Sequence, residues 1–293
     1  MERVQRSGTG LVFALSGAFF YGFNITFAKI AAELGVGGPM IVAERVLVMI
    51  AIGLLVGRLT GASFSVPRHE RVSLFALGLG STGVSICYIS SVAFIPITIA
   101  AVIFYTFPIL IVVLSPLIDR KPLTVSMMAI VLAAFIGVVL VLGTTDASLD
   151  PRGLLLAAGA SASAAIQFFA GTRCRQTGTA AKLVFSQVIV LPTALFTVYF
   201  IGSVFTIDSQ LAAFVPVWLT IGGFVFGFGF QILALTRISA SVAGLAFCLE
   251  PVVAAITSAI VLGERLAIIQ YIGGAIVISA IIATVIVERN KAA

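Results

Sequence analysis

The chain has 293 residues, of which 60% are hydrophobic and only 10% carry a charge. A soluble domain carries about 25% charged residues, so this composition excludes an ordinary soluble enzyme or binding module and indicates an integral membrane protein. The formal net charge of +6 does not indicate nucleic-acid binding, because the basic residues fall in short loops rather than on one polar face.

Ten apolar segments are each long enough to cross a bilayer, which takes roughly 20 residues in helical conformation. The predicted helices are 9–31, 39–58, 72–94, 97–118, 123–142, 152–172, 181–201, 213–235, 240–261 and 267–287. The apolar run 72–118 is too long for one span, and Pro96 divides it. The predicted fold class is therefore an all-α integral membrane protein with ten transmembrane helices.

The second half of the chain repeats the first at an offset of 143 residues, so that Pro108, for example, aligns with Pro251. The two copies, 1–143 and 150–293, each contain five predicted helices. Because five is odd, the second copy must enter the membrane from the opposite side. The prediction is two inverted five-helix repeats within one membrane domain, an architecture typical of secondary transporters.

Lysine and arginine are distributed unevenly between the two sides of these helices. If the N-terminus is cytoplasmic, thirteen of them lie at cytoplasmic ends and loops, and only Arg152 and Arg265 lie in the outer loops. The positive-inside rule therefore predicts that both termini are cytoplasmic. We expect a multi-pass protein of a bacterial inner membrane.

Several short motifs resemble one transporter family. Residues 21–24 (YGFN) resemble the first-helix pattern of the drug/metabolite transporter superfamily, in its ten-helix EamA branch. Residues 249–252 (LEPV), followed by 263–266 (GERL), resemble the ninth-helix signature of that branch, and Arg45 fits its second-helix arginine. The first half departs from the pattern, because residues 119–123 read DRKPL where a GERL-like sequence is expected.

The resemblance implies a central cavity lined by helices one, three, four, six, eight and nine, with helices five and ten at the periphery. It also implies transport of small organic metabolites, frequently outward, and several similar members export amino acids, including aromatic ones. The expected partners are an amphipathic or zwitterionic small molecule, the lipid bilayer and, if transport is coupled, protons. We expect no enzymatic activity, cofactor, metal or nucleic acid.

Glu250 is the clearest candidate site residue. It lies about ten residues into its span, roughly 15 Å deep at about 1.5 Å per residue. An ionisable side chain at that depth costs about 2.5–3.5 kcal/mol to insert and marks a functional site by default. The next residue, Pro251, lacks an N–H and frees a backbone carbonyl in the preceding turn. Glu250 either binds substrate or a proton, or it is a protonated side chain that stabilises the kinked helix.

A second candidate group lies near the outer surface. Lys29 is close to the outer end of the first helix, and Glu44 is close to the outer start of the second. Their similar depth predicts an ion pair, which the adjacent Arg45 either joins or points away from. This group is either a structural pair with a lysine that reaches the headgroups, or an outer gate that anchors a substrate carboxylate.

Amides and hydroxyls within the spans form a third set. Asn24 and Gln167 occupy repeat-related positions in helices one and six, and Gln231 lies in helix eight. Buried amides need partners, which neighbouring helices or a hydrated cavity supply. Tyr88 and Tyr105 offer hydroxyls from helices three and four. Contact with substrate and bonding between helices both remain open.

The chain is therefore predicted to be a secondary transporter that exports neutral or aromatic amino acids by alternating access. The alternative within transport is a drug or other-metabolite exporter of the same fold. The alternative from another class is a channel-like facilitator. A phosphorylated substrate is disfavoured, because a dianion needs several basic residues within the membrane and only Lys29 and Arg45 are available.

Overall fold

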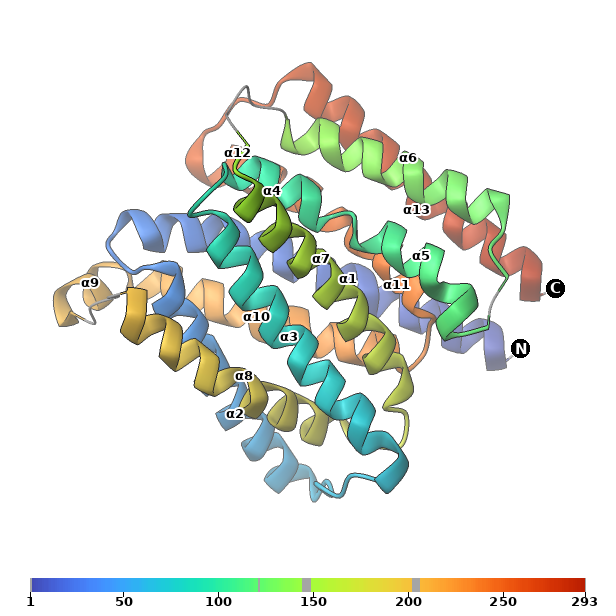
Figure 1. The fold of residues 1–293 in the computed structure, drawn as a ribbon, viewed down its shortest axis with the longest axis horizontal. Coiled ribbons are helices and arrows are strands. Elements are labelled where there is room, and N and C mark those ends of the chain that lie inside the picture. The colour runs from blue at the N-terminus through green and yellow to red at the C-terminus, as the bar shows by residue number, and fades with distance from the viewer. Residues whose placement is uncertain (1, 121, 144–148, 202–205, 293) are drawn as a thin grey trace.

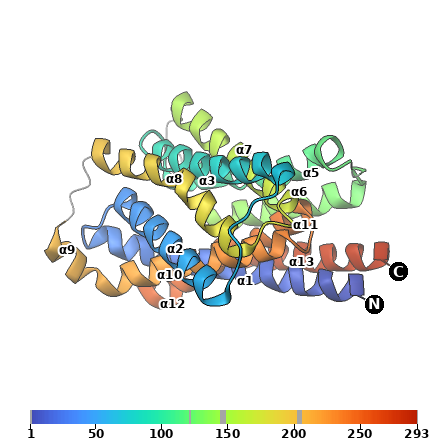
Figure 2. The ribbon, with the colours of Figure 1, turned by 90° about the horizontal axis from the view of Figure 1, so that it is seen from below.

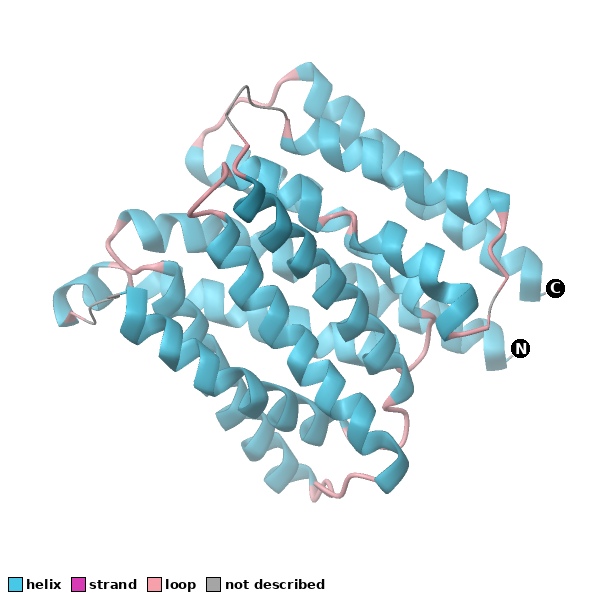
Figure 3. Ribbon diagram, in the orientation of Figure 1, coloured by secondary structure: helices cyan, strands magenta, loops and turns pink. Residues whose placement is uncertain are grey.

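The computed structural model describes residues 2–120, 122–143, 149–201 and 206–292, and every regular element in these ranges is helical. Figure 3 shows helices joined by loops, without a strand in the described part of the chain. The helices are α1 (Glu2–Glu33), α2 (Gly38–Thr60), η1 (Arg68–Glu70), α3 (Arg71–Ser91), α4 (Ile97–Phe104), α5 (Phe107–Ile118), α6 (Val125–Leu142), α7 (Pro151–Arg173), α8 (Thr179–Ile201), α9 (Ile207–Ala212), α10 (Phe214–Leu235), α11 (Ala240–Phe247), α12 (Leu249–Leu262) and α13 (Ile268–Ala292).

Ten helical segments in the described ranges are long and apolar enough to cross a membrane. They are Gly8–Glu33, Gly38–Thr60, Arg68–Ser91, Ile97–Ile118, Val125–Leu142, Pro151–Arg173, Thr179–Phe200, Phe214–Leu235, Ala240–Leu262 and Ile268–Val287, here called spans one to ten. The all-α membrane fold with ten spans is confirmed, and each predicted boundary lies within a few residues of the observed one. The start of α1 and the end of α13 lie at the same end of the bundle, as an even number of crossings requires (Figures 1 and 2).

Spans four and nine are each broken near the middle. Span four consists of α4 and α5, and span nine consists of α11 and α12. At the breaks, the amides of Thr106 and Cys248 bond the carbonyl three residues earlier, each at 3.1 Å, which tightens the turn. Pro108 and Pro251 follow directly and lack the N–H that would continue a regular helix. The broken helices therefore have a local cause in repeat-related prolines.

The helices pack as pairs that join the two halves of the sequence. α1 packs along α10, and α7 packs along α3, near the middle of the bundle. α6 and α13, which form spans five and ten, pair along one edge, and α2 and α8 pair along the opposite edge (Figure 1). The interior is thus formed by helices from both halves.

Two glycines allow the closest of these contacts. A Cβ at Gly223 would lie 2.8 Å from Cβ of Asn24, so only glycine lets α10 approach α1 at this point. A Cβ at Gly80 would lie 2.9 Å from the backbone nitrogen of Gln167, so α3 approaches α7 in the same way. Asn24 lies 143 positions before Gln167, and Gly80 lies 143 positions before Gly223, so the offset exchanges the two contacts. This correspondence supports the internal repeat.

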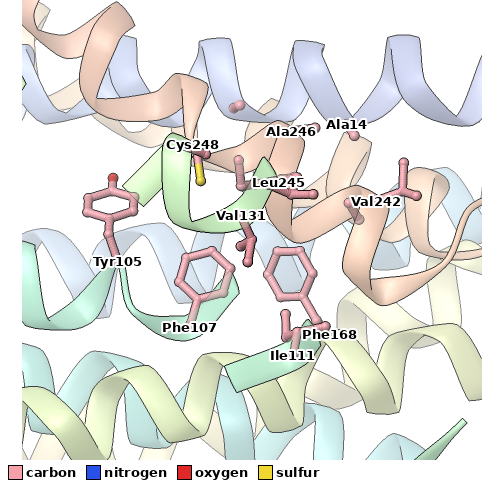
Figure 4. Close-up of a cluster of buried hydrophobic side chains, with 14 of the residues drawn as sticks. Ala14, Tyr105, Phe107, Ile111, Val131, Phe168, Val242, Leu245, Ala246 and Cys248 are labelled. Carbon is pink, nitrogen blue, oxygen red and sulfur yellow. The ribbon is translucent and has the colours of Figure 1, made fainter. Parts of the chain in front are cut away.

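The largest hydrophobic cluster lies where the broken spans meet α6 and α7. Figure 4 shows Phe107 and Phe168 facing each other within it, with ring centroids 5.2 Å apart. Leu245 packs among them from α11. Tyr105 and Cys248 lie at the edge of the cluster (Figure 4). This packed apolar region therefore borders the two helix breaks.

Candidate functional site

Glu250 lies in the first turn of α12, directly after the break in span nine. The residue is half-buried, and its backbone packs against Gly22 of α1. Tyr21 of α1, Tyr88 of α3 and Tyr105 after α4 all lie within electrostatic range of its carboxyl. The Tyr105 hydroxyl is within hydrogen-bonding reach of that carboxyl. A mid-span carboxyl thus lies near hydroxyls from α1, α3 and the break in span four.

The backbone around Glu250 is also tightly packed. A side chain at Gly22 would collide with the Glu250 carbonyl oxygen, so α1 contacts the first turn of α12 directly. Phe247, at the end of α11, packs its ring against Tyr21 with centroids 5.9 Å apart. The position of the carboxyl therefore depends on α1 as well as on its own helix.

The predicted amides Gln167 and Gln231 are bonded to one another. Gln231 donates from Nε2 to Oε1 of Gln167 at 2.9 Å, and Gln167 donates from Nε2 to Oγ of Ser81 at 2.7 Å. The Tyr21 hydroxyl donates to Oε1 of Gln231 at 3.0 Å. This chain of hydrogen bonds joins α1, α10, α7 and α3. It favours the interpretation that these two amides connect helices, with Tyr21 linking them to the surroundings of Glu250.

Asn24 lies apart from this chain. It is 7% exposed and packs against Gly223 of α10. Its repeat-related residue Gln167 packs against Gly80 but also reaches Ser81, so the two amides share a backbone contact and differ in their hydrogen bonding.

The predicted ion pair between Lys29 and Glu44 is wrong. Lys29 instead pairs with Glu264, with 2.7 Å between Nζ and Oε1, and both side chains are about half exposed, at 52% and 46%. Glu44 accepts a hydrogen bond at 2.5 Å from Nε2 of Gln210 in α9. The error arises because similar depth does not make two side chains neighbours. α1 packs against α12, which brings Lys29 to the loop after it, whereas Glu44 near the start of α2 bonds Gln210 of α9.

Arg45 points away from this outer group, although it follows Glu44 in the sequence. Its guanidinium carbon lies 4.1 Å above the ring centroid of Phe224, a residue of α10. Its Nε is buried and has no hydrogen-bond partner. Arg45 also lies within electrostatic range of the Tyr21 hydroxyl. It therefore belongs with the interior polar groups.

Tyr21 is a central residue of this region that was not among the residues expected from the sequence. It lies within electrostatic range of both Arg45 and Glu250, and it bonds to Gln231. The only signal for it was its place at the start of the YGFN motif, because an aromatic residue in an apolar helix is otherwise ordinary. The site formed by Tyr21, Arg45, Tyr88, Tyr105 and Glu250 is called the interior polar site below.

The interior polar site offers separate groups for a cation and an anion. Glu250 can accept hydrogen bonds from an ammonium group or take up a proton, and Arg45 can donate hydrogen bonds to a carboxylate. No group of three or more His, Cys, Asp or Glu side chains in the described ranges is arranged to hold a metal ion. The three cysteines are free, and burial raises the pKa of the Cys174 thiol, just after α7, to about 11. The chemistry offered is binding of polar groups.

Comparisons with known proteins agree with this architecture. The sequence model described as the EamA-like transporter family matches the chain twice, over residues 8–143 and 151–286. The threonine/homoserine exporter RhtA of Salmonella typhimurium strain LT2 is 27% identical over 270 residues, covering 87% of this chain and 84% of the relative. The protein of the same name from Escherichia coli K12 is 26% identical over 275 residues, covering 87% and 85%.

A solved structure described only as a crystal structure of a protein superposes with a TM-score of 0.79 and 20% identity. The match covers 96% of this chain and 98% of that chain. At this identity it shows a shared fold.

Proposed function

The chain belongs to the EamA-like transporter family, and from this premise we propose that it is a secondary transporter that exports neutral amino acids. The relatives named as threonine/homoserine exporters support amino acids as the substrate class. Aromatic amino acids remain within the proposal, because tyrosine and phenylalanine rings line the interior polar site. The membrane is a bacterial inner membrane, with both termini in the cytoplasm.

The position of Glu250 is the observation that carries this proposal. A charged group at mid-membrane is costly to insert and is retained where it faces a protein interior that uses it. Glu250 sits at a helix break, and discontinuous helices near the bilayer midplane are where secondary transporters bind substrates and coupling ions. An amino-acid ammonium group matches the charge and hydrogen-bonding capacity of a carboxylate.

The same carboxyl provides a route to proton coupling. A proton and an ammonium group compete for Glu250, so the carboxyl exchanges one for the other. If the protonated form returns from the outer side, inward proton movement drives outward amino-acid movement. Helices from both halves surround the carboxyl, so a rocking motion between halves alternates its access to the two sides.

Reconstitution in proteoliposomes tests this function. We expect saturable counterflow of labelled threonine, competition by neutral amino acids from a panel, and faster accumulation under a pH gradient. Glu250→Gln removes the titrating group and is expected to abolish gradient-driven accumulation. Glu264→Gln is the matched control, because that carboxylate lies in an exposed ion pair and is expected to leave coupling intact.

Each outcome bears on a separate part of the proposal. Failure of every amino acid to compete rejects the substrate class. Flux that does not saturate and shows no counterflow indicates a channel-like facilitator. Intact gradient-driven accumulation in Glu250→Gln rejects proton coupling through this carboxyl.

A further inference from the structure

We propose that the interior polar site binds both charged ends of one substrate molecule, with the carboxylate at Arg45 and the ammonium group at Glu250. This assignment rests on the proposed function and deepens it. It makes the free zwitterion of an α-amino acid the recognised species, and it gives Arg45 a specificity-determining role.

Among the described residues, Arg45 forms no ion pair with a carboxylate. The ion pairs in the described ranges are Lys29–Glu264, His69–Glu70 and Arg173–Asp119, and none of them includes Arg45. The neighbouring carboxylate of Glu44 is turned toward α9, where it bonds Gln210. Buried charges are costly unless they are paired and hydrogen-bonded, and Nε of Arg45 is buried without a partner. A carboxylate from a substrate supplies what this guanidinium lacks.

Glu250 is the complementary group. It is absent from the same ion pairs of the described ranges, and its polar neighbours are tyrosine hydroxyls. When Glu250 is ionised, it and Arg45 carry opposite charges, and no ion pair in the described ranges joins them. Packing contacts connect Tyr21 to both residues. The Tyr21 ring packs 5.9 Å from the ring of Phe224, on which Arg45 stacks. Gly22, the next residue, contacts the Glu250 carbonyl oxygen. Two unpaired charges of opposite sign near Tyr21 match a molecule that carries both signs.

The chemistry of the two groups favours one orientation of the bound molecule. A guanidinium binds a carboxylate through two parallel N–H···O bonds, which a neutral ester cannot accept with the same strength. A carboxylate accepts stronger hydrogen bonds from a charged ammonium group than from a neutral amide of the same size. A ligand with one charged end leaves the other protein charge buried and unpaired, so the site discriminates against simple amines and simple acids.

The aromatic residues around Tyr21 define the apolar side of the site. Phe224 lies beneath the Arg45 guanidinium and packs 5.9 Å from the Tyr21 ring between centroids. Phe247 packs against Tyr21 at the same centroid distance. These rings hold Arg45 and Tyr21 in place. The competing explanation is that Arg45 only stacks on Phe224 to stabilise the packing of α2 against α10.

Ligand binding to the purified protein separates the two explanations. Threonine, threonine methyl ester and N-acetylthreonine share one side chain, and the last two each lack one charge. Binding is measured by ligand-induced thermal stabilisation in detergent, which does not require transport. For the wild type we expect each derivative to bind roughly 10- to 100-fold more weakly than threonine, the loss of one charge-assisted contact.

The variants assign each contact to one residue. Arg45→Gln is expected to lose the preference for threonine over the methyl ester while it keeps the preference over N-acetylthreonine. Glu250→Gln is expected to show the reverse pattern. Arg173→Gln, which removes an arginine 43% exposed, is the control and should keep both preferences.

Several results overturn the assignment. If Arg45→Gln weakens the binding of threonine and of its methyl ester by the same factor, Arg45 has a structural role only. Amino-acid export by the wild type is not affected by that result. A wild type that binds the methyl ester as tightly as threonine rejects the assignment without any variant, which covers the case that Arg45→Gln does not fold. A wild type that neither binds nor transports amino acids rejects the proposed function itself.

Discussion

The first turns of α5 and α12 occupy repeat-related positions and begin after the same kind of helix break, with Pro108 in one and Pro251 in the other. The side chains just before these prolines differ. Phe107 is 2% exposed and packs its ring on Phe168, whereas Glu250 is half-buried among tyrosines. One break is therefore filled by apolar packing, and the other holds an ionisable group.

This difference indicates that the broken helix is a shared scaffold and that the site depends on the side chain placed upon it. In the first half, the break is closed by Thr106, whose hydroxyl bonds the Ile103 carbonyl at 2.7 Å and lies 2.8 Å from the Ser161 hydroxyl. In the second half, Leu249 takes the aligned position, and it offers no hydroxyl. The two otherwise similar halves therefore differ in which break carries the ionisable side chain.

Placing a carboxyl at the first break should have the largest effect. Phe107→Glu puts a charge where the surrounding side chains are apolar, and an uncompensated buried charge costs about 3–5 kcal/mol. We expect a large loss of thermal stability in detergent. Phe107→Leu is the control, and it should cost less than Phe107→Glu because it keeps the site apolar and leaves only a small cavity. Wild-type stability of Phe107→Glu would show that the first break also accommodates a polar group.

The paired glycines give a test of intermediate size. A methyl group at Gly80 or at Gly223 meets backbone or Cβ atoms at 2.8–2.9 Å, so each Gly→Ala change should destabilise the protein by about 1–3 kcal/mol. Gly222→Ala is the matched control on the same helix as Gly223, because nothing lies within 4 Å of the added carbon. Thermal unfolding measures all three. Equal losses of stability for Gly80→Ala and Gly223→Ala would support the equivalence of the two contacts. A neutral change at one of the two glycines would contradict it.

The exposed ion pairs should have the smallest effect. Lys29–Glu264 joins the end of span one to the loop after span nine, and Arg173–Asp119 joins the end of span six to the end of span four. Exposed pairs contribute about 0–1 kcal/mol, and salt screens them. We expect Lys29→Ala and Arg173→Ala each to lower stability by less than about 1 kcal/mol, with the difference from wild type shrinking at high salt. A much larger loss of stability that does not change with salt would mean that the pair helps to hold the helices together.

Much of the fold follows from the sequence because each span is independently apolar and long enough to cross the bilayer. The depth of a residue within the membrane follows from counting residues along its span, and this count places Glu250 correctly at mid-span. The direction in which a side chain points around its helix could not be predicted, since it depends on which helices become neighbours. Lys29 therefore received the wrong partner, and Arg45 was grouped with Glu44 although adjacent residues on a helix point in different directions. Tyr21 was missed because its importance comes from contacts with α2, α10 and α12.

The contact between α1 and α10 has a consequence for how the chain is made. Tyr21 finds its hydrogen-bond partner Gln231 only after 210 further positions. At roughly 5–20 residues per second, the ribosome takes about 10–40 s to produce that partner. During this interval the first helix is inserted without its final neighbour. Its polar groups therefore need temporary hydrogen-bond partners in the insertion machinery or in the helices that are made before α10. Assembly of the finished bundle is therefore expected to wait for the eighth span.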